Sequence, residues 1–218
     1  MKNNVQQPNY VTPLIVGEPK KVYHCRKYDI SYKQSGQMGN ITVVGVTPEF
    51  KEFDKINDIY EEAFPPAERK LTLEQMLALP MFKLDVNAYY CDGEVAGMSV
   101  TQDIGTFEYL LFFAVDKAMR SSGFGGRILD RIIEDCGGKP LIFSIEDPSE
   151  ECANKEQRIK REAFYLKHNC VYIGFKFKRP ELGSTFLLMS SAKLDDYSSI
   201  TEAACAINPM ISSIIEKY

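Results

Sequence analysis

The segment at residues 107–136 constrains the fold of this chain more than any other stretch. Residues 107–115 form a continuous apolar and aromatic run with one charge, Glu108, and such a run is typical of a strand buried on both faces. A glycine-rich turn follows at residues 121–126, and from Arg127 the apolar residues recur at helical spacing. The sequence therefore predicts a buried strand, a glycine-rich turn and a helix that ends at the Gly-Gly pair beyond it.

This turn has a chemical meaning because it opens a helix. The first amides of a helix lack intrahelical partners and lie at the positive end of its dipole. Glycines let a ligand's oxygens approach that backbone closely, so the turn suits a phosphate or pyrophosphate. The Walker pattern does not fit because Arg127 follows Gly126, and the dinucleotide pattern GxGxxG does not fit because it needs a glycine where Ile128 stands.

One pattern does fit the turn. It is Arg-x-x-Gly-x-Gly at Arg120, Gly123 and Gly125, placed just after the predicted strand. This pattern resembles the acyl-CoA loop of the GNAT N-acetyltransferase superfamily. A second segment, residues 161–170, is similar to the end of the family's last helix and keeps its Phe-Tyr pair. The two segments together indicate a GNAT-like domain at residues 41–190.

The predicted elements of that domain follow the family's order, β-α-α-β-β-β-α-β-α-β-β. Periodicity and turn signals place strands at 41–46, 86–91, 95–101, 107–115, 140–146, 171–177 and 185–189, and helices at 49–64, 73–79, 127–136 and 156–168. Two signals are local: a hairpin turn at Asp92-Gly93 and a capping box of Thr72 with Gln75.

The resemblance implies an α/β (α+β) fold, the GNAT acyl-CoA N-acyltransferase fold. Its central sheet is mixed and mostly antiparallel, with about six to seven strands flanked by helices. The strands at 107–115 and 140–146 are expected to be parallel neighbours. In the family such a pair is splayed apart to hold CoA.

The resemblance says nothing about the two ends of the chain. Residues 1–40 are punctuated by Pro and Gly without a clear period, and we interpret them as an N-terminal extension. Residues 191–218 are expected to form a helical tail that packs on the domain or on a second subunit, because exposed isoleucines are costly in water. The tail has two apolar stripes, one of Ile200, Ala203, Ala204 and Ile207 and one of Ile211, Ile214 and Ile215.

The resemblance assigns two stretches to acetyl-CoA. The pyrophosphate is expected at backbone amides of the loop Arg120, Ser121, Ser122, Gly123, Phe124, Gly125 and Gly126. The pantetheine arm is expected along the exposed main chain of Phe113, Ala114 and Val115, where an amide is the expected oxyanion donor. Relatives often carry a lysine between the loop's arginine and glycine, so the Ser-Ser pair here removes a cation from the phosphate site.

Three residues are candidates for proton transfer. Tyr165 matches the family tyrosine that lies near the thioester sulfur and often acts as general acid; its alternative role is packing, as an amphipathic aromatic residue. Relatives often have a glutamate where this chain has Leu111, so the general base stays open between Glu108, Glu146, a relayed water and an amine that enters already neutral. Either glutamate could equally be a solvated strand end.

The composition of the chain limits the classes of partner that are expected. A net charge of −4 argues against a nucleic-acid binder and mildly favours a cationic partner. No apolar run approaches the ~20 residues that span a bilayer, and residues 1–10 lack the apolar core of a secretory signal, so we expect a cytoplasmic protein without membrane contact. The six cysteines form no CxxC pair and there are two histidines, so no metal is expected.

These features predict an acyl-CoA-dependent N-acyltransferase, monomeric or homodimeric. It is expected to transfer an acetyl group from acetyl-CoA to a primary amine of a small molecule or peptide by direct attack on the thioester. The alternative is a non-catalytic module that keeps the fold and binds CoA or a protein partner. The sequence does not identify the acceptor, because loops that bind acceptors vary freely on such a scaffold.

Overall fold

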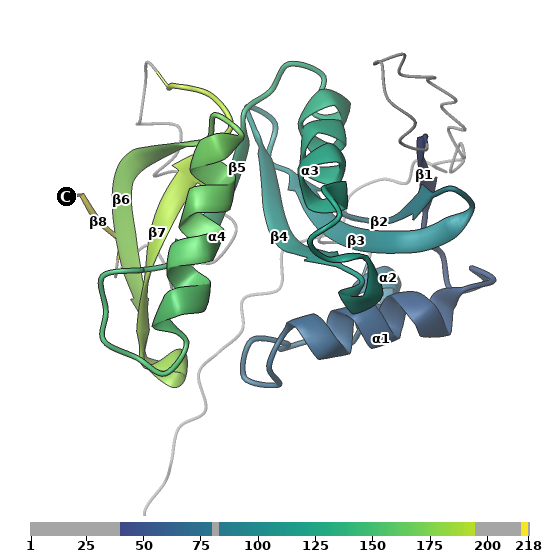
Figure 1. Cartoon of the computed structure of the whole chain (residues 1–218), viewed down its shortest axis with the longest axis horizontal. Helices are drawn as coiled ribbons and strands as arrows, with labels where there is room; N and C mark the ends of the chain where they lie inside the picture. The colour runs from purple at the N-terminus through teal and green to yellow at the C-terminus, as the bar shows by residue number, and fades with distance from the viewer. Residues whose placement is uncertain (1–39, 80–82, 195–214, 218) are drawn as a thin grey trace, which may run out of the picture.

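One mixed β-sheet runs through the described part of the protein (Figure 1). The computed structural model describes residues 40–79, 83–194 and 215–217. The strands lie in the order β1-β2-β3-β4-β5-β7-β6-β8. Their bounds are β1 Ile41–Gly45, β2 Leu84–Cys91, β3 Glu94–Asp103, β4 Glu108–Val115, β5 Leu141–Glu146, β6 Val171–Arg179, β7 Ser184–Ser190 and β8 Ile215–Lys217. Neighbouring strands are antiparallel except β4 and β5, which are parallel as predicted.

Helices cover both faces of this sheet. Their bounds are α1 Phe53–Ala63, α2 Leu73–Ala78, α3 Phe124–Asp135 and α4 Lys155–Lys167, with short 3-10 turns η2 Lys117–Met119 and η3 Pro180–Leu182. Ile128 of α3 and Tyr165 of α4 belong to one buried cluster, while Ile56 of α1 and Leu73 of α2 belong to another. No helix among residues 40–79, 83–194 and 215–217 is long and apolar enough to cross a membrane.

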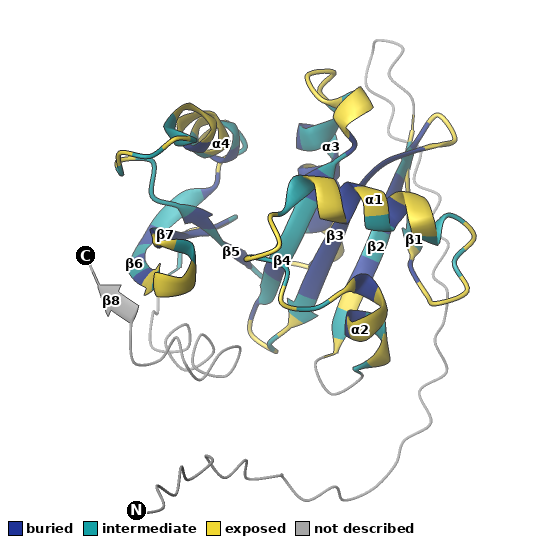
Figure 2. Ribbon diagram, turned by 90° about the horizontal axis from the view of Figure 1, so that it is seen from below, coloured by how far each residue is buried: buried dark blue, intermediate teal, exposed yellow. Residues whose placement is uncertain are grey.

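The strand β4 lies between these two clusters, as its apolar sequence predicts. Phe113 and Val115 pack against the α3–α4 cluster, and Phe112 and Ala114 pack against the α1–α2 cluster. This alternation shows that the two clusters lie on opposite faces of the sheet. The neighbouring strand β3 is buried along most of its length (Figure 2).

The parallel strands β4 and β5 pair along only part of their length. Residues 108–110 of β4 pair with residues 141–143 of β5. Beyond them β4 stays with β3 as far as Val115, while β5 stays with β7 as far as Glu146. We call residues 111–115 and 144–146 the splayed ends. Figure 1 shows β4 and β5 meeting near the top of the view and separating towards the bottom, so the predicted separation is confirmed.

The local signals for helix α2 and for the first hairpin are confirmed. The Thr72 hydroxyl accepts from the Gln75 amide at 3.2 Å, and the Gln75 side chain accepts from the Thr72 amide at 2.9 Å. Strands β2 and β3 meet at Asp92 and Gly93, whose φ angles of 52° and 88° are both left-handed. These are the positive angles that a type I′ hairpin turn requires.

Two predicted helix starts are wrong, although the order of elements is confirmed. The helix predicted from Arg127 begins at Phe124, because Gly123 takes a left-handed φ of 82° and turns the chain into the helix three residues earlier. The helix predicted from Glu49 begins at Phe53, because two hydrogen-bonded turns precede it.

The last described strand corrects part of the predicted tail. Residues Ile215–Lys217 form β8, which pairs antiparallel with residues 175–177 of β6, so the helical prediction is wrong for Ile215. An edge strand such as β6 presents unpaired backbone groups that a short segment can bind. The sheet thus has eight strands, whereas the sequence predicts about six to seven. Residues 1–39 and 195–214, which include the rest of the predicted stripes and the N-terminal extension, lie outside the described residues.

Candidate functional site

The splayed ends present an open strand edge. Beyond Leu110, the side of β4 that faces β5 pairs with no described strand, although its other side stays bound to β3. Backbone groups on such an edge need partners from water, side chains or a ligand. One of them is taken, because the Val115 carbonyl accepts a hydrogen bond from Arg120 Nε at 3.0 Å. The backbone groups of Phe113, predicted to meet the pantetheine arm, point to this open edge. Those of Ala114 point to β3, because the Asp116 amide two positions further on donates to the Ala96 carbonyl of β3.

The glycine-rich loop leads directly from these ends into α3. Two of its residues are left-handed, Ser121 with φ of 65° and Gly123 with φ of 82°. Gly123 is the N-cap of α3 and has no side chain to cap the helix. The first amides of α3, from Phe124 onward, therefore keep donors for an external acceptor at the positive end of the helix dipole. This geometry suits a pyrophosphate.

The close packing of α4 on the first turn of α3 explains one of the loop glycines. A Cβ on Gly126 would lie 2.5 Å from His168 Nε2, so a larger residue there would force His168 to move. A Cβ on Gly125 would make an ordinary contact, 3.6 Å from the Phe164 ring. At Gly123 an added Cβ would meet nothing within 4 Å, so its requirement for glycine is conformational. The sequence alone predicts that all three glycines serve the approach of a ligand.

Cations beside the loop are held by helix α1. Lys117 Nζ lies 3.6 Å from Glu62 Oε1, and Arg120 Nη1 lies 3.7 Å from the same oxygen. Both cationic side chains are about half exposed or more. An anion bound at the start of α3 would therefore compete with Glu62 for Arg120, which stays accessible from solvent.

Tyr165 lies on the buried face of α4. Its ring contacts the Phe143 ring of β5, with centroids 4.3 Å apart, and the Phe164 ring at 5.1 Å. Its hydroxyl bonds to no described residue, yet no fully buried side-chain nitrogen or oxygen in the described chain lacks a partner. The hydroxyl is therefore open to solvent or ligand. Burial raises the pKa of Tyr165 to about 12, so it stays protonated at neutral pH.

The structure does not bring Glu108 to the splayed ends. Glu108 starts the paired part of β4, and Val115 is seven positions further along, roughly 23 Å at about 3.3 Å per residue. A bulge at Leu111 turns Glu108 to the same sheet face as Val115. The two residues are nevertheless too far apart along the strand for Glu108 to reach the splayed ends. Lys139 lies 3.7 Å away. Burial raises the pKa of Glu108, and Asp103 adds to the rise while Lys139 opposes it.

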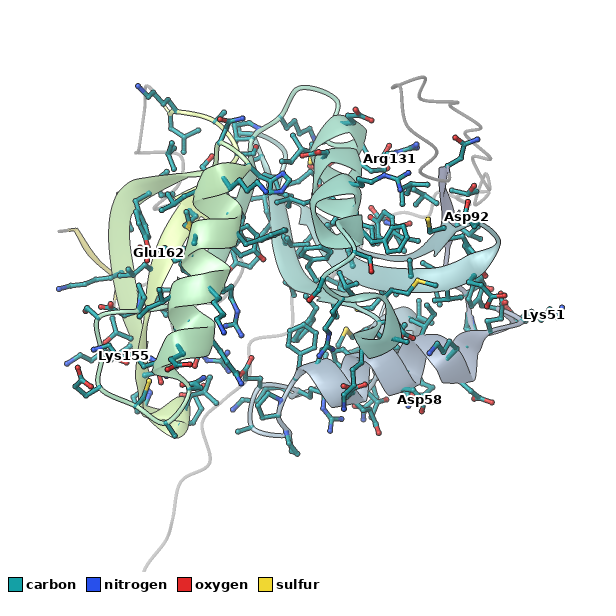
Figure 3. The ribbon with its side chains drawn as sticks, viewed as in Figure 1. Lys51, Asp58, Asp92, Arg131, Lys155 and Glu162 are labelled. Carbon is teal, nitrogen blue, oxygen red and sulfur yellow. The ribbon has the colours of Figure 1, made fainter. Side chains whose placement is uncertain are left out.

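Glu146 does lie at the splayed ends, but its two oxygens are already bound. Arg158 Nη2 lies 2.9 Å from Oε1, and Arg161 Nη1 lies 2.8 Å from Oε2. Arg158 is itself buried and also holds Glu150 at 3.0 Å. This charged network lies near the first turns of α4, where Lys155 is labelled in Figure 3. A carboxylate between two guanidinium groups would have to break an ion pair before taking a proton.

Sequence reasoning missed one acidic residue near this site, Glu68 on the loop between α1 and α2. It interacts electrostatically with Glu146, Arg161 and Arg158, so it lies near the Glu146 end of the splayed ends. Burial and the nearby charge of Glu146 raise its pKa above the ordinary glutamate value. No local sequence signal indicates Glu68, because the charged residues that it interacts with are distant in the sequence and come near it only in the folded protein.

The comparisons with known proteins concern the fold. No protein-family model and no curated protein matches the sequence. A protein described as a GNAT-family acetyltransferase from Bacteroides thetaiotaomicron has a TM-score of 0.64 and 23% identity, over 78% of this chain and 98% of that one. An acetyltransferase from Bacillus subtilis, solved in complex with CoA, has a TM-score of 0.51 and 12% identity, over 71% and 100%. The aminoglycoside 6'-N-acetyltransferase from Enterococcus faecium has a TM-score of 0.51 and 12% identity, over 71% and 99%.

These likenesses and the topology define the class of fold. The mixed sheet, the parallel pair β4–β5 that separates along its length, and the order of the helices are those of the GNAT fold. The chain has this fold, and the fold prediction is confirmed.

Proposed function

We propose that this protein is an acyl-CoA-dependent N-acyltransferase that transfers an acetyl group from acetyl-CoA to a primary amine of a small molecule or peptide. The observation that carries the proposal is the open edge of β4 directly beside the uncapped start of α3. The open edge of β4 supplies backbone hydrogen-bond partners for the pantetheine arm. The start of α3 supplies amide donors for the pyrophosphate. The CoA complex of the Bacillus subtilis structure of this fold supports the same ligand.

Each part of the site has a role in this proposal. Acetyl-CoA, when bound, supplies a thioester carbonyl as the electrophile. The amides from Gly123 to Gly126 hold the pyrophosphate, and the main chain of Phe113 to Val115 orients the arm and donates to the oxyanion that develops on attack. These assignments keep the predicted pantetheine residues and the part of the predicted loop from Gly123 to Gly126, and Gly126 has a packing role as well.

Tyr165 fits the role of hydrogen-bond donor to the leaving sulfur. Its pKa of about 12 lies above the value of about 8.5 for an ordinary thiol. Complete proton transfer from the phenol to the thiolate would be uphill by roughly 3.5 pKa units, about 5 kcal/mol. A hydroxyl that keeps its proton and donates a hydrogen bond avoids that barrier while stabilising the developing negative charge.

Acetyl-CoA is expected to stabilise the folded protein. At a hundredfold excess over its Kd the gain in free energy of unfolding is about 2.7 kcal/mol, which raises Tm by roughly 5–10 °C in a chain of this size. Thermal unfolding with millimolar acetyl-CoA measures it, with acetyl phosphate as a control that lacks the pantetheine arm. No shift would contradict the proposal. The release of CoA thiol from acetyl-CoA is then measured with a set of primary amines. An enzyme would release thiol, whereas a non-catalytic module would bind acetyl-CoA without turnover.

Gly123→Val is expected to abolish acetyl-CoA binding while the protein stays folded. Valine at a φ of 82° strains the backbone by about 1–2 kcal/mol or more and moves the first amides of α3. Gly105→Val is the matched control, because Gly105 has a φ of 98°, has no atom within 4 Å of an added Cβ and lies before β4. Calorimetric titration should find binding lost in the first variant and kept in the second. Equal binding by both would show that the loop is not the anion site.

A further inference from the structure

The loop between α1 and α2 is held in a defined conformation beneath the splayed ends (Figure 1). Arg69 Nε donates to the Phe64 carbonyl at 2.8 Å, and the Tyr60 hydroxyl donates to the Leu71 carbonyl at 3.0 Å. These two contacts fix the loop at both of its ends. They therefore also fix the position of Glu68, which lies between them in the chain.

Charged groups of the other half of the sheet interact electrostatically with Glu68. They come from β5, from α4 and from the end of β6, and are Glu146, Arg158, Arg161 and Arg179. On its own loop, Arg69 is paired with Glu61 at 3.3 Å, and Lys70 reaches Glu181 of η3 at 3.9 Å. This last contact shows that the loop extends to the β6–β7 side of the splayed ends.

Glu68 differs from the other acidic residue at the site. It is half-buried, and its carboxylate has no hydrogen bond or ion pair with any residue of the described chain. Both oxygens of Glu146, by contrast, are held by arginines. Glu68 is thus a carboxylate on the α1–α2 loop, near Glu146, whose oxygens are not held by other residues of the described chain.

We propose that Glu68 is the general base that deprotonates the acceptor amine. This inference rests on the proposed function and names the residue that the sequence left open. The carboxylate takes one proton from the substrate ammonium group, and the neutral nitrogen forms a bond to the thioester carbon. The carbon–sulfur bond breaks, and a second nitrogen proton passes to the sulfur. The products are the amide and CoA thiol, and Glu68 returns its proton to solvent.

The electrostatics of the loop agree with this role. Burial and Glu146 raise the pKa of Glu68, and Arg161, Arg179 and Arg158 act in the opposite direction. A carboxyl pKa raised towards the working pH makes a glutamate a more effective proton acceptor. The surrounding arginines favour the ionised form, which is the form that accepts a proton.

The test compares Glu68→Gln with Glu74→Gln, which removes the same charge from an exposed position on α2. Acetyl-CoA binding is measured first, by thermal shift. Thiol release is then followed against pH with an aminoglycoside, a polyamine, an arylalkylamine and a peptide with a free N-terminus. Glu68→Gln should bind acetyl-CoA as the wild type does, lose 10²–10⁴-fold in kcat/KM, and lack the rising limb of the pH profile. Glu74→Gln should match the wild type.

Two outcomes overturn the proposal. The first is a Glu68→Gln variant that keeps the wild-type rate and pH profile. The second is a Glu68 carboxyl resonance, identified by its loss in the variant, that titrates at or below the ordinary glutamate value in ¹³C NMR. The NMR titration needs no acceptor and so decides even where no amine is turned over. Failure of the wild type to bind acetyl-CoA would instead contradict the proposed function.

Discussion

Arg158→Met is expected to lower the free energy of unfolding by about 3–5 kcal/mol, as removal of one partner from a buried ion pair does. The Arg158 side chain is 4% exposed, and it holds Glu146 at 2.9 Å and Glu150 at 3.0 Å. It also donates to the Ser184 hydroxyl at 2.8 Å. Methionine has similar length but leaves these carboxylates without this counter-charge. In a chain of this size Tm should fall by roughly 6–20 °C.

Arg161→Met is the matched control for this network. The Arg161 side chain is 45% exposed and makes one ion pair with Glu146, so its loss should cost about 0–1 kcal/mol. Urea denaturation of both variants measures the difference. If the two variants lose equal stability, Arg158 is not the centre of the network.

The pH dependence of the same network has a definite sign. Burial acts to raise the pKa of Glu150, but hydrogen bonds from Thr185 and Arg158 outweigh it and hold the pKa below its ordinary value. A lowered carboxyl pKa contributes stability above the ordinary glutamate value of about 4.3, and this contribution is lost as the pH falls through the folded-state pKa. The difference in free energy of unfolding between wild type and Arg158→Met should therefore be largest near neutral pH and become smaller in acid.

Tyr165→Phe is expected to lower kcat roughly ten- to a thousandfold with little change in acetyl-CoA affinity. The substitution removes one hydroxyl and keeps the ring contacts with Phe143 and Phe164, so the packing should be preserved. Because the pKa of Tyr165 is about 12, its hydroxyl stays protonated and should add no falling limb to the wild-type pH profile below about pH 10. Steady-state kinetics from about pH 6 to about pH 10 measures both the fall in kcat of the variant and the shape of the wild-type pH profile.

Tyr172→Phe is the control for the loss of a tyrosine hydroxyl. Tyr172 lies on β6 and its hydroxyl bonds to Glu162 at 2.5 Å, on the β6 side of α4 (Figure 3). This variant should keep kcat within about a factor of two, since the bond lies away from the splayed ends. A Tyr165→Phe variant with the same small effect would leave Tyr165 with a packing role only.

Local sequence signals predicted most of the secondary structure. The capping box at Thr72 and the turn at Asp92-Gly93 each depend on residues within three or four positions of one another, so the sequence contains everything they need. The start of α3 was misplaced because it depends on the backbone angle of Gly123. The strand at Ile215–Lys217 was mistaken for helix because its partner, β6, lies about 40 residues away.

Local sequence patterns were enough to predict the order of elements, the buried strand β4 and a glycine-rich loop that opens a helix. These follow from hydrophobic period and from glycine's conformational freedom, which are properties of neighbouring residues. The positions of the carboxylates depend on the tertiary structure. Glu108 lies a strand's length from the splayed ends, and Glu146 is bound by arginines of α4. Glu68 interacts with Glu146 from a different loop, and its catalytic role is our proposal. Charge and burial depend on contacts between distant segments, and those contacts exist only after the sheet has formed.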